Sequence, residues 1–512
     1  MYFLYQFNGW RGMPRTALRS CGIYVCCLSS LWLSACGEQR GAALEALEPA
    51  ASVGQPGGWA DDLQLAAPRD LNPDPNILEI ELEARIEPME IRPGTLTPVW
   101  TYSGGLPGPL IRAKLGDTII VHFSNALPEA TSIHWHGMRL DNDMDGVPGI
   151  TQPPVEPGGE LRYEFVARDA GTFWYHPHIN SAAQVGQGLY GPLVVEDPDD
   201  PEAFGDDVVL LLSDMSLDAD GQFLPADHGG AFGDLFGREG STLLVNGRVV
   251  PTLKVRAGKP QRWRVINGAR ARYYTIALRG HSIVKLGGDN GLAARSTPVN
   301  RVVLVPGERA DLVVIPSRNP DATAMLQWIP TDRGFGSVFN RPRQDMLRIE
   351  TVDEAPVAPA AIPEFLRQIE PIDISDAIEL DLDLTIDTQR TREGSQIVMG
   401  INGVPYWDSK PLMASIGQTQ VWTLINDTAF SHPFHLHGYF FQVLDETRIP
   451  EWKDTVDIPA DSSVRIAIQF DERPGVWMYH CHILDHADVG MMGHLFVGAD
   501  EHSTPPELHL MH

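Results

Sequence analysis

The chain has 512 residues, a formal net charge of −28 at pH 7 and 43% hydrophobic residues. Its length is too great for one hydrophobic core and predicts three or four domains of the usual ~100–200 residues. The strong acidity argues against nucleic acid as a partner and favours small or cationic partners, although solubility alone would also account for it.

The N-terminal segment indicates export. Four of the five cysteines lie within the first 36 residues, so the rest of the chain contains one thiol, Cys481. Residues 1–35 carry arginines followed by an apolar run at 23–33, which is too short for an ordinary membrane span and is typical of a signal peptide. Residues 33–36, Leu-Ser-Ala-Cys, resemble a bacterial lipoprotein box. We therefore expect a protein of the periplasm or outer cell surface, anchored to a membrane through lipidated Cys36; plain secretion after cleavage near Ala35 is the alternative.

The remaining chain predicts a tether followed by β-structure. Residues 36–75 are rich in Ala, Gly, Pro and acidic residues and lack a sustained apolar period, which is typical of a flexible segment. From residue 76 onward, short β-rich runs such as 77–82 and 118–123 alternate with Gly and Pro, and sustained helical patterns are few. This pattern predicts an all-β fold of sandwich domains.

An internal repeat sets the number of domains. A glycine precedes an asparagine by nine residues across an apolar run at three places: Gly116 and Asn125, Gly258 and Asn267, Gly417 and Asn426. Three copies predict three consecutive sandwich domains, at residues 76–197, 205–352 and 364–500, joined by acidic or Pro-rich linkers.

Four His-x-His pairs occupy matching places in the first and third copies of the repeat. They are His134 and His136, His176 and His178, His435 and His437, and His480 and His482. The middle copy has Ile276 and Leu278 instead, so we expect it to carry no ligands and to act as a spacer and possible substrate wall. Because side chains alternate along a strand, each pair places two imidazoles on one face. The eight imidazoles predict a cluster shared between the first and third domains.

Cys481 lies between His480 and His482 and belongs to a second set of ligands. His432, Cys481, His486 and Met491 supply imidazole, thiolate and thioether groups, a combination that selects copper over zinc and is typical of a blue-copper site. Met492 is the competing axial ligand, although the spacing favours Met491. Strand alternation turns the flanking histidines away from the Cys481 side chain, so one tripeptide contacts two metal sites.

These motifs resemble those of the three-domain, laccase-like multicopper oxidases, which are built from cupredoxin domains, and the resemblance extends from about residue 76 to 500. It implies a type 1 copper at His432, Cys481, His486 and Met491. It implies a type 2 copper at His134 and His435 and a type 3 pair at His136, His176, His178, His437, His480 and His482, giving four copper ions. A small reducing substrate would give single electrons to the type 1 copper, and O2 would be reduced to water at the other three.

Acidic residues bear on the supply of protons for O2 reduction, and two classes of electron-donating substrate stay open. The resemblance implies that Asp145 lies beside the cluster; an ordinary loop aspartate is the alternative. Several bacterial relatives have Glu after the second type 1 histidine, where this chain has Ala487. Asp485 or Asp488 are the possible substitutes, and a different proton relay is the alternative. The donor is expected to be phenolic or aromatic; the alternative is a metallo-oxidase acting on Cu(I), Fe(II) or Mn(II). A copper-free structural protein is disfavoured because no ligand is missing. We expect a monomer.

Overall fold

The computed structural model describes residues 63–317, 323–334, 341–391 and 394–506. The expected signal peptide, Cys36 and the tether up to residue 62 lie outside the described residues. Residues 63–75 contact the domains that follow: Asn246 Nδ2 donates to the Leu63 carbonyl at 3.0 Å, and the Leu110 amide donates to the Ala66 carbonyl at 2.7 Å. Within the described ranges, no helix is long and apolar enough to span a membrane.

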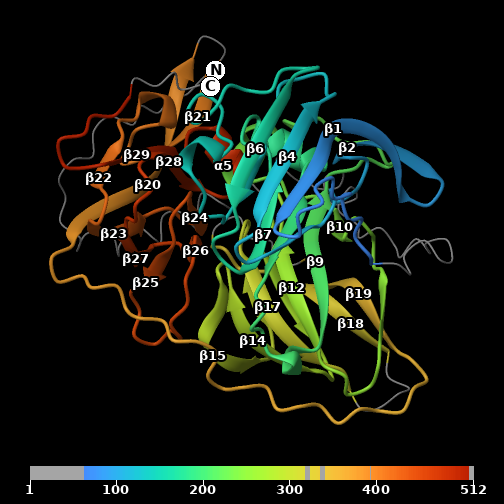
Figure 1. The fold of residues 1–512 in the computed structure, drawn as a ribbon. Helices are drawn as coiled ribbons and strands as arrows, with labels where there is room; N and C mark the ends of the chain where they lie inside the picture. Colours follow the sequence, from blue (N-terminus) through green and yellow to red (C-terminus); the bar gives the residue numbers. More distant parts are fainter. Residues whose placement is uncertain (1–62, 318–322, 335–340, 392–393, 507–512) are drawn as a thin grey trace, which may run out of the picture. The chain divides into compact units, whose positions relative to one another are not determined.

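The fold is all-β, as predicted, and its strands form six sheets that group into three pairs along the chain (Figure 1). We refer to the three pairs as the first, middle and third domains. The first domain joins a sheet ordered β2-β1-β4-β6 with a sheet ordered β3-β8-β7-β5. Its strands are β1 (Ile77–Arg92), β2 (Thr95–Tyr102), β3 (Ile111–Lys114), β4 (Thr118–Asn125), β5 (His134–His136), β6 (Glu160–Val166), β7 (Gly171–His176) and β8 (Gly191–Glu196).

The middle domain joins a sheet ordered β10-β9-β12-β17-β14-β15 with a sheet ordered β11-β19-β18-β13-β16. Its strands are β9 (Asp206–Met215), β10 (Thr242–Val245), β11 (Thr252–Val255), β12 (Gln261–Asn267), β13 (Tyr274–Leu278), β14 (Ser282–Gly288), β15 (Gly291–Val299), β16 (Val302–Leu304), β17 (Arg309–Ile315), β18 (Thr323–Ile329) and β19 (Gln344–Thr351).

The third domain joins a sheet ordered β21-β20-β23-β27-β25 with a sheet ordered β22-β29-β28-β24-β26. Its strands are β20 (Ile378–Thr391), β21 (Gly394–Ile401), β22 (Leu412–Ser415), β23 (Thr419–Asn426), β24 (His432–Leu436), β25 (Phe441–Val443), β26 (Thr455–Ile458), β27 (Ser462–Gln469), β28 (Gly475–Cys481) and β29 (Met492–Gly498). Short α-helices α3 (Ser181–Gln187), α4 (Gly230–Phe236) and α5 (Leu484–Asp488) lie between strands.

The repeated glycine and asparagine bound the same strand in each domain. The three glycines have φ between +74° and +93°, a region that favours glycine, and precede β4, β12 and β23. The asparagines end these strands and are buried. Each asparagine Nδ2 donates to two or more backbone carbonyls of neighbouring loops and strand ends, and each Oδ1 accepts a backbone N–H two residues later. The repeat therefore fixes the loop that leads to the histidine strands β5 and β24.

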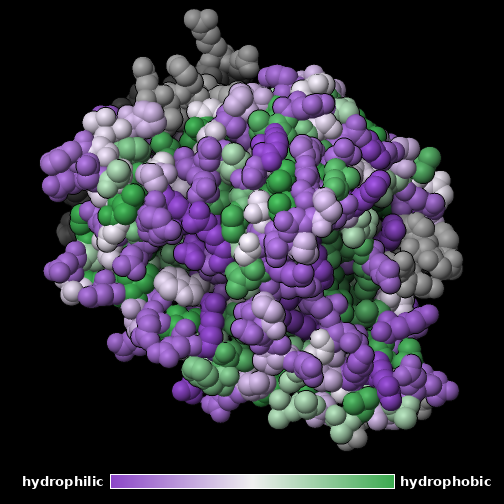
Figure 2. Space-filling view, viewed as in Figure 1, coloured by the Kyte–Doolittle hydropathy of each residue, from purple (hydrophilic) through white to green (hydrophobic). Residues whose placement is uncertain are grey.

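The buried apolar side chains explain how the first and third domains are held together. One continuous core contains residues of both, including Trp135 and Trp422, whereas the middle domain has its own core around Trp263 and Trp328. On the face shown in Figure 2, hydrophilic side chains predominate and hydrophobic ones are interspersed among them, in keeping with the acidic composition. The shared core places the ligand-bearing strands of two domains against each other.

Candidate metal centre

Eight imidazoles from the first and third domains meet in one cluster. In the first domain β5 runs antiparallel to β7 with His134 opposite His176, and in the third β24 runs antiparallel to β28 with His435 opposite His480. Across the two domains, the rings of His136 and His435 stack with centroids 3.8 Å apart. The cluster consists of His134, His136, His176, His178, His435, His437, His480 and His482, and all except the half-buried His178 are fully buried.

Hydrogen bonds around the cluster fix the orientation of five of these rings. Four donate from Nδ1 to a backbone carbonyl oxygen at 2.8 to 2.9 Å: His134, His176, His435 and His480. His437 donates from Nδ1 to the Asp145 carboxylate at 2.8 Å. Because a neutral imidazole carries one proton, Nε2 of each ring keeps its lone pair for a ligand.

The free nitrogens fit a metal centre. Six buried ring nitrogens have no protein partner: Nε2 of His134, His176 and His435, Nδ1 of His136, and both nitrogens of His482. Nε2 of His480 lies 3.2 Å from Nε2 of His437 and 3.4 Å from Nε2 of His178. Buried lone pairs without a donor are costly, and metal cations satisfy them. Three groups of three within these histidines have ligand atoms within 4.8 Å of one another, which is the spacing that metal ions require.

Burial keeps the cluster neutral. Burial, together with the neighbouring imidazole of His435, lowers the pKa of His480 to about 3. Burial likewise lowers the pKa of His136, His176 and His482 well below the ordinary value. Neutral rings are the form that binds metals, so this pocket is suited to cations at physiological pH.

A second, smaller site surrounds Cys481. Its Sγ lies 3.5 Å from Nδ1 of His486 and 3.6 Å from Nδ1 of His432, and these two nitrogens are 3.1 Å apart. Nε2 of His486 donates to the Leu235 carbonyl at 3.1 Å, and Nε2 of His432 lies 3.0 Å from the Thr428 hydroxyl. Burial raises the pKa of the Cys481 thiol, so a cation in this pocket is needed to hold it as a thiolate.

The two methionines after this site have different surroundings. Met491 is fully buried in the same apolar cluster as Cys481, and the Cys481 amide donates to its carbonyl at 3.0 Å. Met492 packs in a separate small cluster with Met478 and Tyr406. The structure therefore groups Met491, and not Met492, with Cys481.

Asp145 contacts histidines of both domains. It follows the 3-10 helix η2 (Asn142–Met144) and is buried. Its carboxylate accepts from His437 of the third domain, and its backbone carbonyl accepts from His134 of the first. Asp145 thus lies at the cluster and holds two of its rings in place.

A cavity of about 440 Å³ borders the cluster on another side. Its lining includes His178, His480, Ala487 and Asp488. The Asp488 carboxylate accepts from the Ala182 amide of α3 at 3.0 Å. Of the two carboxylates that sequence reasoning offered as substitutes for the missing Glu, only Asp488 is among the described residues lining this cavity.

Asp485 is directed elsewhere, into a buried ion pair. Its carboxylate accepts from Arg238 Nη1 at 2.5 Å and from Arg270 Nη2 at 2.5 Å, and its side chain is fully buried. Both arginines belong to the middle domain. Asp485 therefore joins α5 to the middle domain and does not line the cavity.

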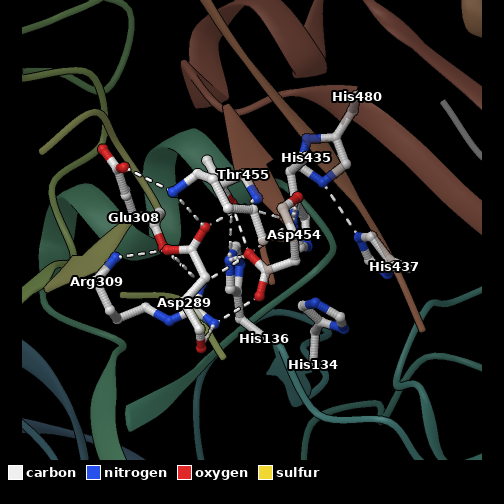
Figure 3. A network of polar contacts seen from close by, with 12 residues as sticks. His134, His136, Asp289, Glu308, Arg309, His435, His437, Asp454, Thr455 and His480 are labelled. Carbon is white, nitrogen blue, oxygen red and sulfur yellow. Dashed lines mark hydrogen bonds and ion pairs between the residues drawn. The ribbon is translucent and has the colours of Figure 1, made fainter. Parts of the chain in front are cut away.

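The middle domain also reaches the cluster through a polar network that sequence reasoning missed (Figure 3). Arg309 at the start of β17 is fully buried and donates from Nη1 to Asp454 Oδ1 at 2.7 Å and from Nη2 to Oδ2 at 2.5 Å. Asp454 Oδ1 lies 3.3 Å from Nε2 of His136 and 3.5 Å from Nδ1 of His435. Although burial alone would raise the pKa of Asp454, the Arg309 guanidinium holds it well below the usual range. A carboxylate is thus fixed beside two cluster histidines.

Gly307, two residues before Arg309, lies against the cluster as well. A Cβ placed on it would lie 2.9 Å from the His482 ring and 3.0 Å from the His136 ring. The Pro-Gly-Glu-Arg sequence around it suggests only a turn, and nothing in its spacing signals a metal site. The middle domain contributes no histidine to the cluster, but it forms part of its wall, which goes beyond the expected spacer role.

Comparison with known proteins identifies the family. Three multicopper oxidase family models match residues 84–200, 206–327 and 376–501. A multicopper oxidase of Mycobacterium tuberculosis is 32% identical over 442 residues, covering 78% of this chain and 83% of the relative. The chain belongs to the multicopper oxidase family. It is therefore a copper-dependent oxidoreductase that uses O2 as its acceptor and takes electrons from a reducing substrate.

Other multicopper oxidases are similar along most of their length. A laccase of Bacillus subtilis is 27% identical, covering 77% of this chain and 89% of the relative. The solved structure of a Campylobacter jejuni multicopper oxidase, described as a metallo-oxidase, matches with a TM-score of 0.76 and 28% identity, covering 85% of this chain and 94% of that one. The relatives thus include both an enzyme named for laccase activity and one named for metal oxidation.

Proposed function

We propose that this multicopper oxidase takes electrons one at a time at the Cys481 site and reduces O2 to water at the eight-histidine cluster. One observation carries the proposal: Cys481 and its neighbours on both sides belong to different sites. The Cys481 Sγ faces His432 and His486, whereas the rings of His480 and His482 lie in the cluster. Three consecutive residues therefore connect the two sites through covalent bonds.

Four copper ions fit the ligands that the chain offers. We assign a type 1 ion to His432, Cys481, His486 and Met491, a type 2 ion to His134 and His435, and a type 3 pair to the six other cluster histidines. Bound copper supplies a one-electron acceptor beside Cys481 and stores electrons at the cluster. Four one-electron oxidations of the donor, together with four protons, reduce one O2 to two water molecules.

The protein's own groups prepare this chemistry. Asp145 and the backbone carbonyls hold the ring tautomers that leave Nε2 free, so the ligands need little rearrangement. Asp454 adds a fixed negative charge next to His136 and His435, which offsets positive charge gathered at the cluster. Burial excludes bulk water from the cluster rings other than the half-buried His178.

We test the assignment with Cys481→Ser. The variant should lose the intense visible absorption of a thiolate–copper bond and its oxidase activity, because the hydroxyl replaces the only thiol among the described residues. Copper at the eight-histidine cluster should stay largely bound, as measured by metal content. A variant that stays blue would show that Cys481 is not a ligand.

For the donor, we propose a phenolic or aromatic compound, supported by the similarity to the Bacillus subtilis laccase. O2 uptake by the copper-loaded enzyme with hydroquinone tests this directly. Absence of uptake with every organic donor would exclude it. A reduced metal ion, Cu(I), Fe(II) or Mn(II), is the second candidate, supported by the similarity to the Campylobacter metallo-oxidase and by the net charge of −28. Faster turnover with metal ions than with phenols would favour it.

We further propose that the enzyme is exported to the cell envelope and anchored by acylated Cys36, on the strength of the lipoprotein-like sequence at residues 33–36. The monomeric state expected from the sequence stays a prediction. Mass spectrometry of the N-terminal peptide from membrane fractions tests the anchor, with Cys36→Ser as the variant. An unmodified peptide in a soluble fraction would exclude it.

A further inference from the structure

A buried arginine of the middle domain lies beside the Cys481 site. The Arg333 side chain is only 10% exposed, and its guanidinium lies over the ring of Tyr273, 5.0 Å from the ring centroid. Tyr273 is buried in the same apolar cluster as Cys481. A guanidinium keeps its positive charge at every physiological pH. Arg333 therefore places a permanent cation near the thiol of this site.

Backbone and side-chain contacts fix Arg333 against the segments that carry the two histidines of the site. The amide of Ser431, the residue before His432, donates to the Arg333 carbonyl at 2.7 Å. Arg333 Nη2 donates to the Phe236 carbonyl of α4 at 2.9 Å. The carbonyl of the residue before Phe236 accepts from Nε2 of His486 at 3.1 Å. Arg333 is thus fixed close to both imidazoles.

The positive charge of Arg333 acts on all three of these side chains. Burial and the Arg333 guanidinium lower the pKa of His486 to about 3. Burial, the neighbouring His486 imidazole and Arg333 lower the pKa of His432 well below the ordinary value. Burial raises the pKa of the Cys481 thiol, whereas the Ile483 backbone N–H and the Arg333 charge act in the opposite direction. One cation therefore influences two imidazoles and the thiol.

Glu239 offsets part of the positive charge in this region. Its Oε1 lies 3.4 Å from Arg333 Nη2. Its Oε2 lies 3.1 Å from Arg272 Nη1 and 2.5 Å from Arg341 Nη1. Although burial alone would raise the pKa of Glu239, these three guanidiniums lower it, so the carboxylate is ionised at neutral pH. A single negative charge shared by three guanidiniums offsets only part of their combined charge.

A fixed charge of this kind changes the reduction potential of a neighbouring metal ion. One-electron reduction lowers the charge of a copper ion from +2 to +1. A nearby positive charge destabilises the oxidised ion more than the reduced ion, and it therefore raises the reduction potential. The effect is strong between buried charges, because the protein interior screens them less than water does. A copper ion with a higher potential accepts electrons from weaker reductants.

We propose that Arg333 raises the reduction potential of the type 1 copper through its charge, without contacting the metal, and so extends the donors of this enzyme to weak reductants such as phenols. This inference rests on the proposed function, because it takes Cys481, His432 and His486 as the copper ligands.

Redox titration of the blue absorption measures this potential directly. Arg333→Gln removes the charge but keeps an N–H donor for the Phe236 carbonyl, so the potential should fall. At a fixed applied potential, the ratio of oxidised to reduced type 1 copper should rise about tenfold, which corresponds to about 59 mV for one electron. An unchanged potential in a variant that stays blue would overturn the proposal.

Two further variants separate the charge of Arg333 from its packing. Arg333→Lys retains the charge and should keep most of the potential. The matched control is Arg341→Gln, which removes another guanidinium that pairs with Glu239. The Arg341 side chain is 25% exposed, so water screens its charge better and the potential should change much less. A fall in Arg333→Lys or in Arg341→Gln equal to that in Arg333→Gln would overturn the proposal.

Asp457→Asn gives a change of opposite sign and also serves if Arg333→Gln does not fold. The Asp457 carboxylate accepts from Tyr273 Oη at 2.8 Å, and its charge adds to the effect of burial in raising the pKa of Cys481. With a pKa of about 6, Asp457 is ionised at pH 7.5. Asp457→Asn removes this negative charge and keeps an acceptor for Tyr273, so the potential at pH 7.5 should rise. A potential that stays the same or falls would overturn the control of this site by buried charge.

Turnover with hydroquinone links the potential to the donor. In the copper-loaded enzyme, kcat/KM for hydroquinone should fall in Arg333→Gln and recover in Arg333→Lys, because the driving force for taking an electron follows the potential. If neither the parent nor any variant is blue, Cys481 does not bind copper, and the proposed function fails together with this inference. If all the proteins are blue and have equal potentials, only the role of Arg333 fails.

Discussion

Gly307 makes a testable contact with the cluster. Its φ is +86°, and an added Cβ would press on His482 and His136. Gly307→Ala should therefore lower the copper content of the cluster and the O2 uptake while the blue absorption stays. The matched control is Gly116→Ala, at φ +93° with nothing within 4 Å, which has a similar backbone cost of about 1–2 kcal/mol without touching a ligand. Equal copper contents in the two variants would contradict the expected contact.

The raised pKa of the buried Asp457 carboxyl predicts that the free energy of unfolding depends on pH. Burial raises its pKa from 3.8 to about 6, and Tyr273 Oη donates to its Oδ1 at 2.8 Å. The pKa of Asp457 is higher in the folded state than in the unfolded state. Its contribution to the free energy of unfolding is therefore fully present below about pH 4 and is lost as the pH rises through about 6, by at most about 3 kcal/mol. Asp457→Asn keeps the acceptor for Tyr273, so its unfolding temperature should exceed that of the parent at pH 7.5 and match it near pH 4. A difference that does not vary with pH would contradict the raised pKa.

The start of β17 connects all three domains through one side chain. Arg309 donates to the Thr172 carbonyl of the first domain at 2.9 Å and to Asp454 of the third. Removing one partner of a buried ion pair leaves an uncompensated charge and costs about 3–5 kcal/mol. Arg309→Met should therefore lower the free energy of unfolding, measured with urea, by about 3–5 kcal/mol.

The same substitution at an exposed ion pair gives the control for Arg309→Met. Arg295 pairs with Glu364 at 3.3 Å, and their side chains are 63% and 81% exposed. Arg295→Met should cost less than about 1 kcal/mol, since exposed pairs contribute little. Arg309→Lys should retain part of the stability through Asp454. If Arg309→Met costs no more than Arg295→Met, the guanidinium does not join the domains.

Copper bound at the eight-histidine cluster should stabilise the packing of the first domain against the third. The cluster histidines come from β5 and β7 in one and from β24 and β28 in the other, so metal bound there stabilises the assembled state. A ligand at a thousandfold excess over Kd adds about 4 kcal/mol. Calorimetry should show a higher unfolding temperature with copper than without it.

Two variants separate the sites in that experiment. His136→Ala removes a ligand from the interdomain cluster and should lose most of the copper-dependent shift. Met491→Leu removes only a weak axial ligand within the third domain and should keep it. If His136→Ala retains the full shift, copper does not bridge the domains through these histidine pairs.

The sequence alone predicted the all-β class and the candidate ligands, because both depend on local spacing. A two-residue period places His134 and His136, or His480 and His482, on one side of a strand, and the glycine–asparagine repeat marks where such strands begin and end. Such patterns lie within about ten residues of the chain and need no knowledge of how the domains pack.

The family resemblance placed Asp145 beside the cluster, but only the tertiary structure revealed which rings it contacts and which other groups surround the ligands. Arg309 and Asp454 are 145 residues apart in sequence, Asp145 and His437 are 292 apart, and Leu235 and His486 are 251 apart. Each contact joins segments of different domains, so it depends on how whole sheets pack and leaves no periodic signal in either segment. For the same reason the sequence could assign His486 as a ligand but could not show that a carbonyl of α4 accepts from its Nε2. Local spacing determines which side chains share a face of a strand, and long-range packing determines which groups those side chains contact.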